Sequence, residues 1–279
     1  MKTILFPTDF SANADSAINH AVSIARIFNA ELILFNSYPI PVYVTDMPVD
    51  MQMNNAMKTE SENKLTYLSN KLITAYPDLK VRCASNWGFA SDEIVTAAAD
   101  FKSDLIIMST RGAGIIKKLF LGSNTAAVIS KAHCPVLAIP AGTEYKPILN
   151  IVFASDCMDD EFEAIEKMNE WIEKFNASLT LLHIDDGILN HQFESTIVHA
   201  FKEKITARFK IKKIEFEHID VPDFVSGLNE FLIDGSFDLL VMAHHSRNFI
   251  NQLLNPSHTR SVAYNLVTPL LMIPIAKNQ

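Results

Sequence analysis

The sequence predicts an α/β protein of two tandem domains, each a doubly wound, five-stranded parallel sheet with helices on both faces. Two observations carry this prediction. The chain contains an internal repeat, since residues 104–140 align without a gap with residues 238–274 at an offset of 134. In both copies, short runs that are apolar throughout, such as LIIM and LLVM, alternate with amphipathic stretches. Such runs are typical of strands buried on both faces of a parallel sheet, and their alternation with helices is typical of the doubly wound fold.

The repeat extends toward the N-terminus and locates one long loop. Residues 2–9 match residues 149–156, and residues 28–37 match residues 175–184, both at an offset of 147. The change of offset from 147 to 134 makes the second copy 13 residues shorter between its second and third strands. We expect the extra length of the first copy to form an extended loop at 39–55, where three prolines stand.

The individual elements follow from the local pattern in chain order. The first copy opens on a short apolar run that ends at Pro7, after which amphipathic and apolar stretches alternate. Its strands are expected at 2–7, 31–37, 80–85, 104–109 and 135–139, and its helices at 13–28, 54–76, 91–102 and 123–132. The second copy has expected strands at 149–154, 178–184, 212–219, 237–243 and 269–273, and expected helices near 159–175, 191–210, 223–234 and 257–267. The two domains are therefore expected at residues 1–143 and 147–279.

Composition argues against several classes of function. The net charge of −8 lies entirely in residues 147–279, since residues 1–146 carry 13 basic and 13 acidic side chains. An acidic chain without a basic patch is a poor nucleic-acid binder, because that binding depends on neutralising phosphates. No apolar run is long enough to span a membrane, and the first ten residues are typical of a buried strand rather than a secretory signal. Three isolated cysteines are expected to be small buried hydrophobic residues in a reducing cytoplasm.

The first copy carries a glycine-containing loop that the second copy lacks. Residues 109–123 follow the pattern S-x2-G-x9-G-S, and the counterpart at 243–257 reads A-x2-S-x9-P-S. Glycines let backbone N–H groups approach a phosphate closely, and a helix that starts near Ser123 adds further N–H donors. Pro256 has no N–H to offer in the second copy. The spacing is neither a P-loop nor a dinucleotide fingerprint, so as an isolated pattern these glycines can equally be turn residues.

The same spacing resembles the universal stress protein signature G-x2-G-x9-G-[ST], with Ser109 in place of the first glycine. The stretch PTDFS at 7–11, the GFA that begins at Gly88, and CPVLAIP at 134–140 resemble the same family. The resemblance covers the whole first copy, and the strand pattern extends it to the second. The chain is therefore similar to a tandem universal stress protein of the adenine-nucleotide α-hydrolase-like superfamily, whose domains would pair through their closing strands as an intramolecular pseudo-dimer.

This resemblance implies an adenine-nucleotide site in the first copy, for ATP or AMP, with Mg²⁺ only as the counter-ion of the nucleotide. The implied residues flank the base (Pro7, Thr8, Asp9, Ser37), line the ribose and α-phosphate (Met108, Ser109, Arg111, Gly112) and hold the outer phosphates (Gly122, Ser123, Asn124). Asp9 has a second interpretation, as an acidic N-cap of the helix that follows it. No metal site is expected, because the adjacent His244 and His245 would point to opposite faces of a strand.

The function expected from these features is a cytoplasmic, nucleotide-binding module of stress adaptation with little or no catalysis, at most weak ATP hydrolysis. Two alternatives stay open. One is a scaffold of the same fold that binds no nucleotide. The other is an adenine-nucleotide-processing enzyme, against which the absence of HIGH-like and SGGxDS-like motifs argues. The expected partners are the nucleotide and a possible second copy of the chain, with neither nucleic acid nor membrane.

Overall fold

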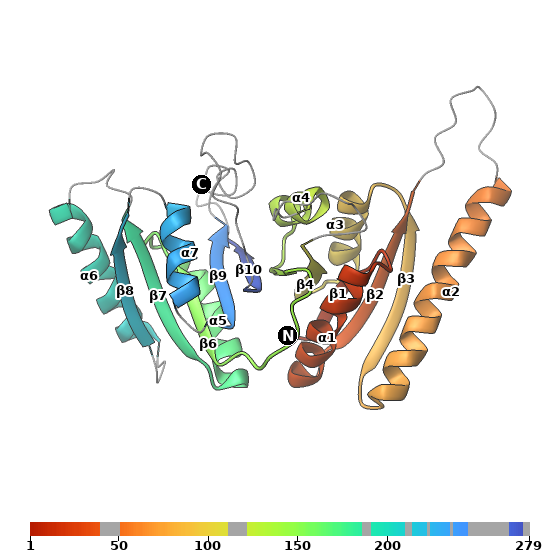
Figure 1. The fold of residues 1–279 in the computed structure, drawn as a ribbon, viewed down its shortest axis with the longest axis horizontal. Helices are drawn as coiled ribbons and strands as arrows, with labels where there is room; N and C mark the ends of the chain where they lie inside the picture. The colour runs from red at the N-terminus through yellow and green to blue at the C-terminus, as the bar shows by residue number, and fades with distance from the viewer. Residues whose placement is uncertain are drawn as a thin grey trace, which may run out of the picture. The chain divides into compact units, whose positions relative to one another are not determined.

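A computed structural model describes most of the chain, which divides into two compact units (Figure 1). The described residues are 1–39, 51–110, 122–185, 191–209, 214–221, 224–234, 237–244 and 268–275. One unit contains the described residues up to Tyr145, and the other contains those from Lys146 onward. Each unit is built on its own parallel sheet.

The sheet of the first unit has the strand order β3-β2-β1-β4-β5. Its strands are β1 (Thr3–Pro7), β2 (Glu31–Tyr38), β3 (Lys80–Trp87), β4 (Leu105–Ser109) and β5 (Val136–Ile139). Its helices are α1 (Ala12–Phe28), α2 (Met51–Ala75), α3 (Ala90–Asp100) and α4 (Ser123–Lys131). Because crossovers between parallel strands are right-handed, α1 and α2 cover one face and α3 and α4 the other (Figure 1). The chain order reverses between β1 and β4, which is where ligands of such sheets bind.

The second unit repeats this plan, with the strand order β8-β7-β6-β9-β10. Its strands are β6 (Asn150–Ala154), β7 (Ser178–Asp185), β8 (Ile214–Asp220), β9 (Leu239–His244) and β10 (Leu270–Pro274). Its described helices are α5 (Glu161–Phe175), α6 (His191–Arg208) and α7 (Phe224–Asp234). The helix expected at 257–267 lies outside the described residues. The predicted fold class is confirmed in both units.

Hydrophobic burial concentrates on the central strands, as the apolar runs predict. The side chains of β1 and β4 are almost completely buried, and Phe6 and its counterpart Phe153 are among the largest fully buried side chains. Of the three cysteines, Cys157 is buried as expected, whereas Cys134 is half-buried and Cys83 is exposed. The expectation for Cys83 is wrong because β3 is the edge strand of its sheet, where one side of the strand lacks a neighbour.

Polar residues form the ends of α1 and α5, and the C-terminal ends of these two helices share the same local chemistry. The hydroxyl of Ser11 accepts a hydrogen bond from the N–H of Ala14 at 3.3 Å and so caps α1. Asn29 ends α1 in the left-handed conformation with φ 51°, and Asn176 ends α5 in the same way with φ 49°. Asparagine tolerates this conformation, and the N–H of the cap residue then reaches the last carbonyl groups of the helix.

The two units also share a set of hydrogen bonds at the amino ends of their central strands. The carboxylate of Asp104 accepts from the backbone N–H groups of residues 2 and 3, at 2.5 and 2.9 Å. The carboxylate of Asp238 accepts from those of residues 149 and 150, at 2.9 Å each. Each aspartate thus ties the start of one central strand to the start of its neighbour, which fixes the register of β1 against β4 and of β6 against β9.

Candidate functional site

The candidate site of the first unit lies where β1 and β4 end, at the point where the chain order reverses. Thr8 follows β1 and is buried, and its backbone N–H donates to the carbonyl of Phe35 on β2 at 2.8 Å. Its hydroxyl accepts from the N–H of Phe10 at 3.0 Å, and Phe10 has a positive φ of 59°. The chain therefore makes a tight, fastened turn as it leaves the strand and enters α1.

Asn36 on β2 holds this turn from the side, and the sequence patterns do not identify it. Its Nδ2 donates to the carbonyl of Thr8 at 2.7 Å, and its Oδ1 accepts from the hydroxyl of Ser61 on α2 at 2.7 Å. All three residues are buried. The only signal in the sequence is an asparagine that directly follows the apolar run LILF of β2. Asn36 thus positions the backbone of Thr8 and Asp9 from the face that α2 covers.

Asp9 has an exposed side chain at this turn, and it does not cap α1. Its Oδ1 accepts from the N–H of Ser11 at 3.1 Å, while Ser11 itself is the N-cap. In the second unit Asp156 stands at the matching place, and the N-cap of α5 is Asp160. The N-cap interpretation of Asp9 is therefore wrong, because the helix begins two residues further along the chain than that interpretation requires.

The phosphate-side residues stand at the end of β4 and the start of α4. Ser109 is buried, and its carbonyl accepts from the hydroxyl of Thr125 in the first turn of α4 at 3.0 Å. The N–H of Gly122 donates to the carbonyl of Thr110 at 2.6 Å, and Gly122 is the N-cap residue of α4 without a side-chain cap. These two bonds fasten the N-terminus of α4 beside the carboxyl end of β4. A helix start with uncapped N–H groups carries partial positive charge.

The other predicted site residues fall on the same edge of the sheet. Ser123 and Asn124 are exposed in the first turn of α4. Ser37 is half-buried, and because it follows Asn36 along β2, its side chain points to the opposite face, which α3 and α4 cover. Pro7 and Met108 are buried in β1 and β4, so they offer mainly backbone at this edge. Arg111 and Gly112 lie outside the described residues.

Next to Ser37, the environment also perturbs a titrating side chain. Burial, with a smaller contribution from the charge of Glu62, raises the pKa of the Tyr38 phenol above its ordinary value. Across the described part of the chain, no group of three or more His, Cys, Asp or Glu side chains is placed to hold a metal ion. Among the same residues, no helix is long and apolar enough to cross a membrane.

The second unit repeats the strand-end turn with different side chains. Ser155 replaces Thr8, and its hydroxyl accepts from the N–H of Cys157, whose φ is 59°, at 3.0 Å. His183 replaces Asn36, and its Nδ1 donates to the carbonyl of Ser155 at 2.9 Å. Glu161 replaces Ala14 and is 2% exposed, with its carboxylate accepting from the Ser155 hydroxyl at 2.5 Å and from the N–H of Asp156 at 3.1 Å. The turn is retained although its polar residues are exchanged.

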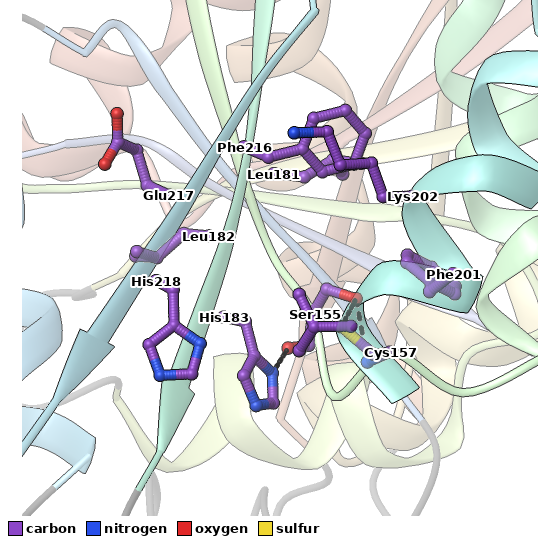
Figure 2. Close-up of a pocket in the computed structure, with 11 residues that line it drawn as sticks. Ser155, Cys157, Leu181, Leu182, His183, Phe201, Lys202, Phe216, Glu217 and His218 are labelled. Atoms are coloured by element: carbon purple, nitrogen blue, oxygen red, sulfur yellow. Dashed lines mark hydrogen bonds between the residues drawn. The ribbon is translucent and has the colours of Figure 1, made fainter. Parts of the chain in front are cut away.

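A cavity of about 150 Å³ opens beside this second turn, between α6 and the strands β6 to β8 (Figure 2). Ser155 and Cys157 border it at the end of β6, and His183 and His218 stand side by side on β7 and β8 with their rings 5.4 Å apart. Lys202 comes from α6 and lies over the ring of Phe216 at 4.8 Å. The sequence patterns give no indication of this cavity, because its walls come from four separate elements.

Comparison with known proteins places these features in one family. The universal stress protein family model matches residues 1–140 of the chain. A universal stress protein of Methanocaldococcus jannaschii is 31% identical over 141 residues, which are 50% of this chain and 81% of that protein. Another, from Thermus aquaticus, is 30% identical over 139 residues, which are 50% of this chain and 98% of that protein. A solved universal stress protein from Archaeoglobus fulgidus covers 99% of this chain and 97% of its own, with a TM-score of 0.71 and 17% identity. That last likeness shows that the fold extends over both units.

Proposed function

We propose that this chain, which belongs to the universal stress protein family, binds an adenine nucleotide in its N-terminal domain, residues 1–143, with little or no catalysis. One observation supports this proposal above the others. The uncapped N-terminus of α4 is fastened to the end of β4 through Thr125 and Gly122, next to the turn at Thr8 that ends β1. Backbone N–H groups and the positive end of a helix dipole are thereby presented at the reversal of strand order, which suits an anion.

The nucleotide would lie along this edge with its two ends recognised differently. The base would sit against the backbone of Pro7, Thr8 and Asp9. Ser37 would flank it from the sheet face that α3 and α4 cover. The ribose and α-phosphate would pass Met108 and Ser109 and reach Arg111 and Gly112. The outer phosphates would meet Gly122, Ser123 and Asn124 at the start of α4. Mg²⁺ would enter only with the phosphates, as their counter-ion.

Two substitutions at the start of α4 test this arrangement, and both are expected to abolish nucleotide binding while they differ in their effect on stability. Ser123→Asp places a negative charge at the first turn of α4, where it interacts favourably with the helix dipole but repels a phosphate. Gly122→Pro fits the observed φ of −57° but removes the N–H that holds Thr110, and it copies the second loop into the first. Gly122→Ala keeps that N–H and is the matched control.

The measurement is calorimetric titration of the full chain with ATP, AMP and cyclic AMP, each with and without Mg²⁺. Cyclic AMP is included because a universal stress protein has been crystallised in complex with it. The protein must first be shown free of co-purified nucleotide by mass spectrometry after denaturation. We expect the unchanged chain and Gly122→Ala to bind, and Gly122→Pro and Ser123→Asp to lose binding while Ser123→Asp keeps its melting temperature. No heat with any ligand would sink the nucleotide proposal and favour the scaffold.

We further propose that the second domain, residues 147–279, serves as the architectural partner of the first. The closing strand of each unit, β5 or β10, ends the sheet of that unit and is apolar along its length. Apolar edge strands need a cover, and each copy carries a strand that could cover the other. The isolated cysteines support a reducing, cytoplasmic setting for the assembly. Two whole chains could also form a homodimer, in addition to the pairing of the two domains within each chain.

A further inference from the structure

We propose that the cavity of the second unit binds a small aromatic carboxylate of about the size of benzoate. This site is distinct from the proposed nucleotide site and does not depend on it. The cavity lies on the sheet face that α5 and α6 cover, because its walls include α6 (Figure 2). The phosphate-side elements of the first unit, Ser37 and α4, belong to the other face of their sheet.

The size and the walls of the cavity select a ring. Its volume is about 150 Å³. A dry apolar cavity of roughly this size accepts benzene in another protein. The sheet contributes Leu181 and Phe216, and α6 contributes Val198 and Phe201. Leu181 and Phe201 are each 3% exposed, so they form the floor, while Val198 and Phe216 are half-buried and stand nearer the mouth.

The polar groups at the inner end are already engaged, which keeps the charge of the ligand away from that end. The Ser155 hydroxyl donates to Glu161, and it also accepts from the N–H of Cys157. The Nδ1 of His183 donates to the carbonyl of Ser155. A ring can pack against these satisfied groups, whereas a carboxylate there would stand beside the buried carboxylate of Glu161 and be repelled.

The positive charge of Lys202 favours a ligand that carries a negative charge. Two other cations of α6 have carboxylate partners, since Lys204 contacts Asp159 at 2.6 Å and Arg208 contacts Glu166 at 3.2 Å. In the described residues, the ammonium of Lys202 lies over Phe216 and has no carboxylate within ion-pair distance. Glu217 stands next to Phe216 in the sequence, so its side chain points away from Lys202 across the strand (Figure 2). The mouth of the cavity thus combines an unmatched positive charge with an apolar floor.

The first unit differs from the second at the residue that matches His183. There the matching residue, Asn36, reaches Ser61 on α2 through a buried hydrogen bond of 2.7 Å, which draws the helix onto the strand end. In the second unit the ring of His183 lies beside that of His218, with ring centroids 5.4 Å apart. Both histidine rings border the cavity, together with Phe201 and Lys202 of α6.

The test is ligand-observed NMR titration of the full chain with benzoate, benzyl alcohol and acetate. Benzoate should bind most tightly, benzyl alcohol more weakly because it lacks the charge, and acetate not measurably because it lacks the ring. Lys202→Met should weaken benzoate roughly fivefold, the upper end for an exposed ion pair, and leave benzyl alcohol unchanged. Since Lys202 is exposed, this variant should fold normally.

A second variant guards against binding elsewhere on the molecule. Val198→Trp fills the mouth from a half-buried helix position and should abolish binding of both ring compounds, while Gly122→Pro in the first unit should leave them unaffected. Absence of benzoate binding to the unchanged chain overturns the proposal. Equal affinities for benzoate and benzyl alcohol, or full binding to Val198→Trp with an unchanged melting temperature, overturn it as well.

Discussion

At the scale of single residues, His20 is a titratable side chain that its surroundings perturb strongly. It lies in α1 with 5% of its surface exposed, its ring packs edge-on against Tyr145, and its Nδ1 has no hydrogen-bond partner among the residues that the structure describes. Burial lowers its pKa from 6.5 to about 4, and a hydrogen bond with the backbone of Ser16 offsets only part of this effect. The folded protein therefore favours the neutral imidazole.

This depressed pKa predicts a loss of stability in acid. The unfolded chain takes up a proton on His20 near pH 6.5, whereas the folded chain does so only near pH 4, so the stabilisation is complete above pH 6.5 and is lost as the pH falls toward 4. The loss should approach about 3 kcal/mol in the free energy of unfolding. Urea unfolding at pH 7.5 and at pH 4.5, compared between the unchanged chain and His20→Leu, measures it. The carboxylates titrate in both proteins and cancel, so equal pH dependence in the two would contradict the prediction.

Single residues also mark the limit of what the sequence predicts about the site. Thr8, Asp9, Ser109 and Gly122 are predicted as site residues from the family resemblance, which is carried by short stretches of neighbouring residues. Partners that come from distant elements leave no such trace. Glu161 looks like an ordinary surface acid of a helix, and its burial against Ser155 depends on the three-dimensional course of the β6–α5 turn.

At the scale of elements, all ten described strands are predicted, and the central ones most directly, because strands buried on both faces are apolar throughout. The outer strands β3 and β8 contain polar, exposed residues and are expected from the alternation of strands and helices in each copy. The boundaries are less predictable, since they depend on capping and neighbours. Helix α2 begins at Met51, three residues before the expected start, so the loop expected at 39–55 is shorter at its C-terminal end than expected. Most of that loop lies outside the described residues.

The paired aspartates give a matched prediction at the same scale. Asp104→Ala and Asp238→Ala each remove a carboxylate that accepts from two backbone N–H groups. Each should cost about 1–3 kcal/mol of local stability, because both donors lose a charged acceptor. Hydrogen exchange followed by mass spectrometry should show faster exchange in residues 2–9 for the first variant and in residues 149–156 for the second.

Asp100→Ala supplies the control for this pair. Asp100 is exposed in the last turn of α3, where a negative charge opposes the helix dipole, so its removal should be neutral or slightly stabilising. If Asp104→Ala were as silent as Asp100→Ala, the clamp at the amino ends of β1 and β4 would have no energetic role. If either clamp variant loosened both units equally, the two sheets could not be treated as separate local structures.

At the scale of the whole molecule, the duplication has kept the architecture and changed the chemistry. The strand order, the positive-φ turn residues and the aspartate clamps recur in both units. The side chains at the strand ends do not, and the whole net charge of −8 falls in residues 147–279. A second copy that keeps its sheet while exchanging its polar site residues is typical of selection for folding and assembly, with the ligand of each copy free to diverge.

This pattern leads to a prediction about the separated halves. If the closing strands β5 and β10 cover each other in the intact chain, then residues 1–146 alone expose an apolar edge strand, which attracts another copy. Light scattering after size-exclusion chromatography should show the soluble fragment as a dimer, or the fragment should be lost as insoluble aggregate. The intact chain should not need a second copy to cover its closing strands. Adding separately purified residues 147–279 should convert the fragment into a one-to-one complex, because the natural partner strand competes with self-pairing. If fragment 1–146 stayed a stable monomer and did not bind residues 147–279, the two domains would fold independently. The duplication would then have a role other than pairing of the closing strands.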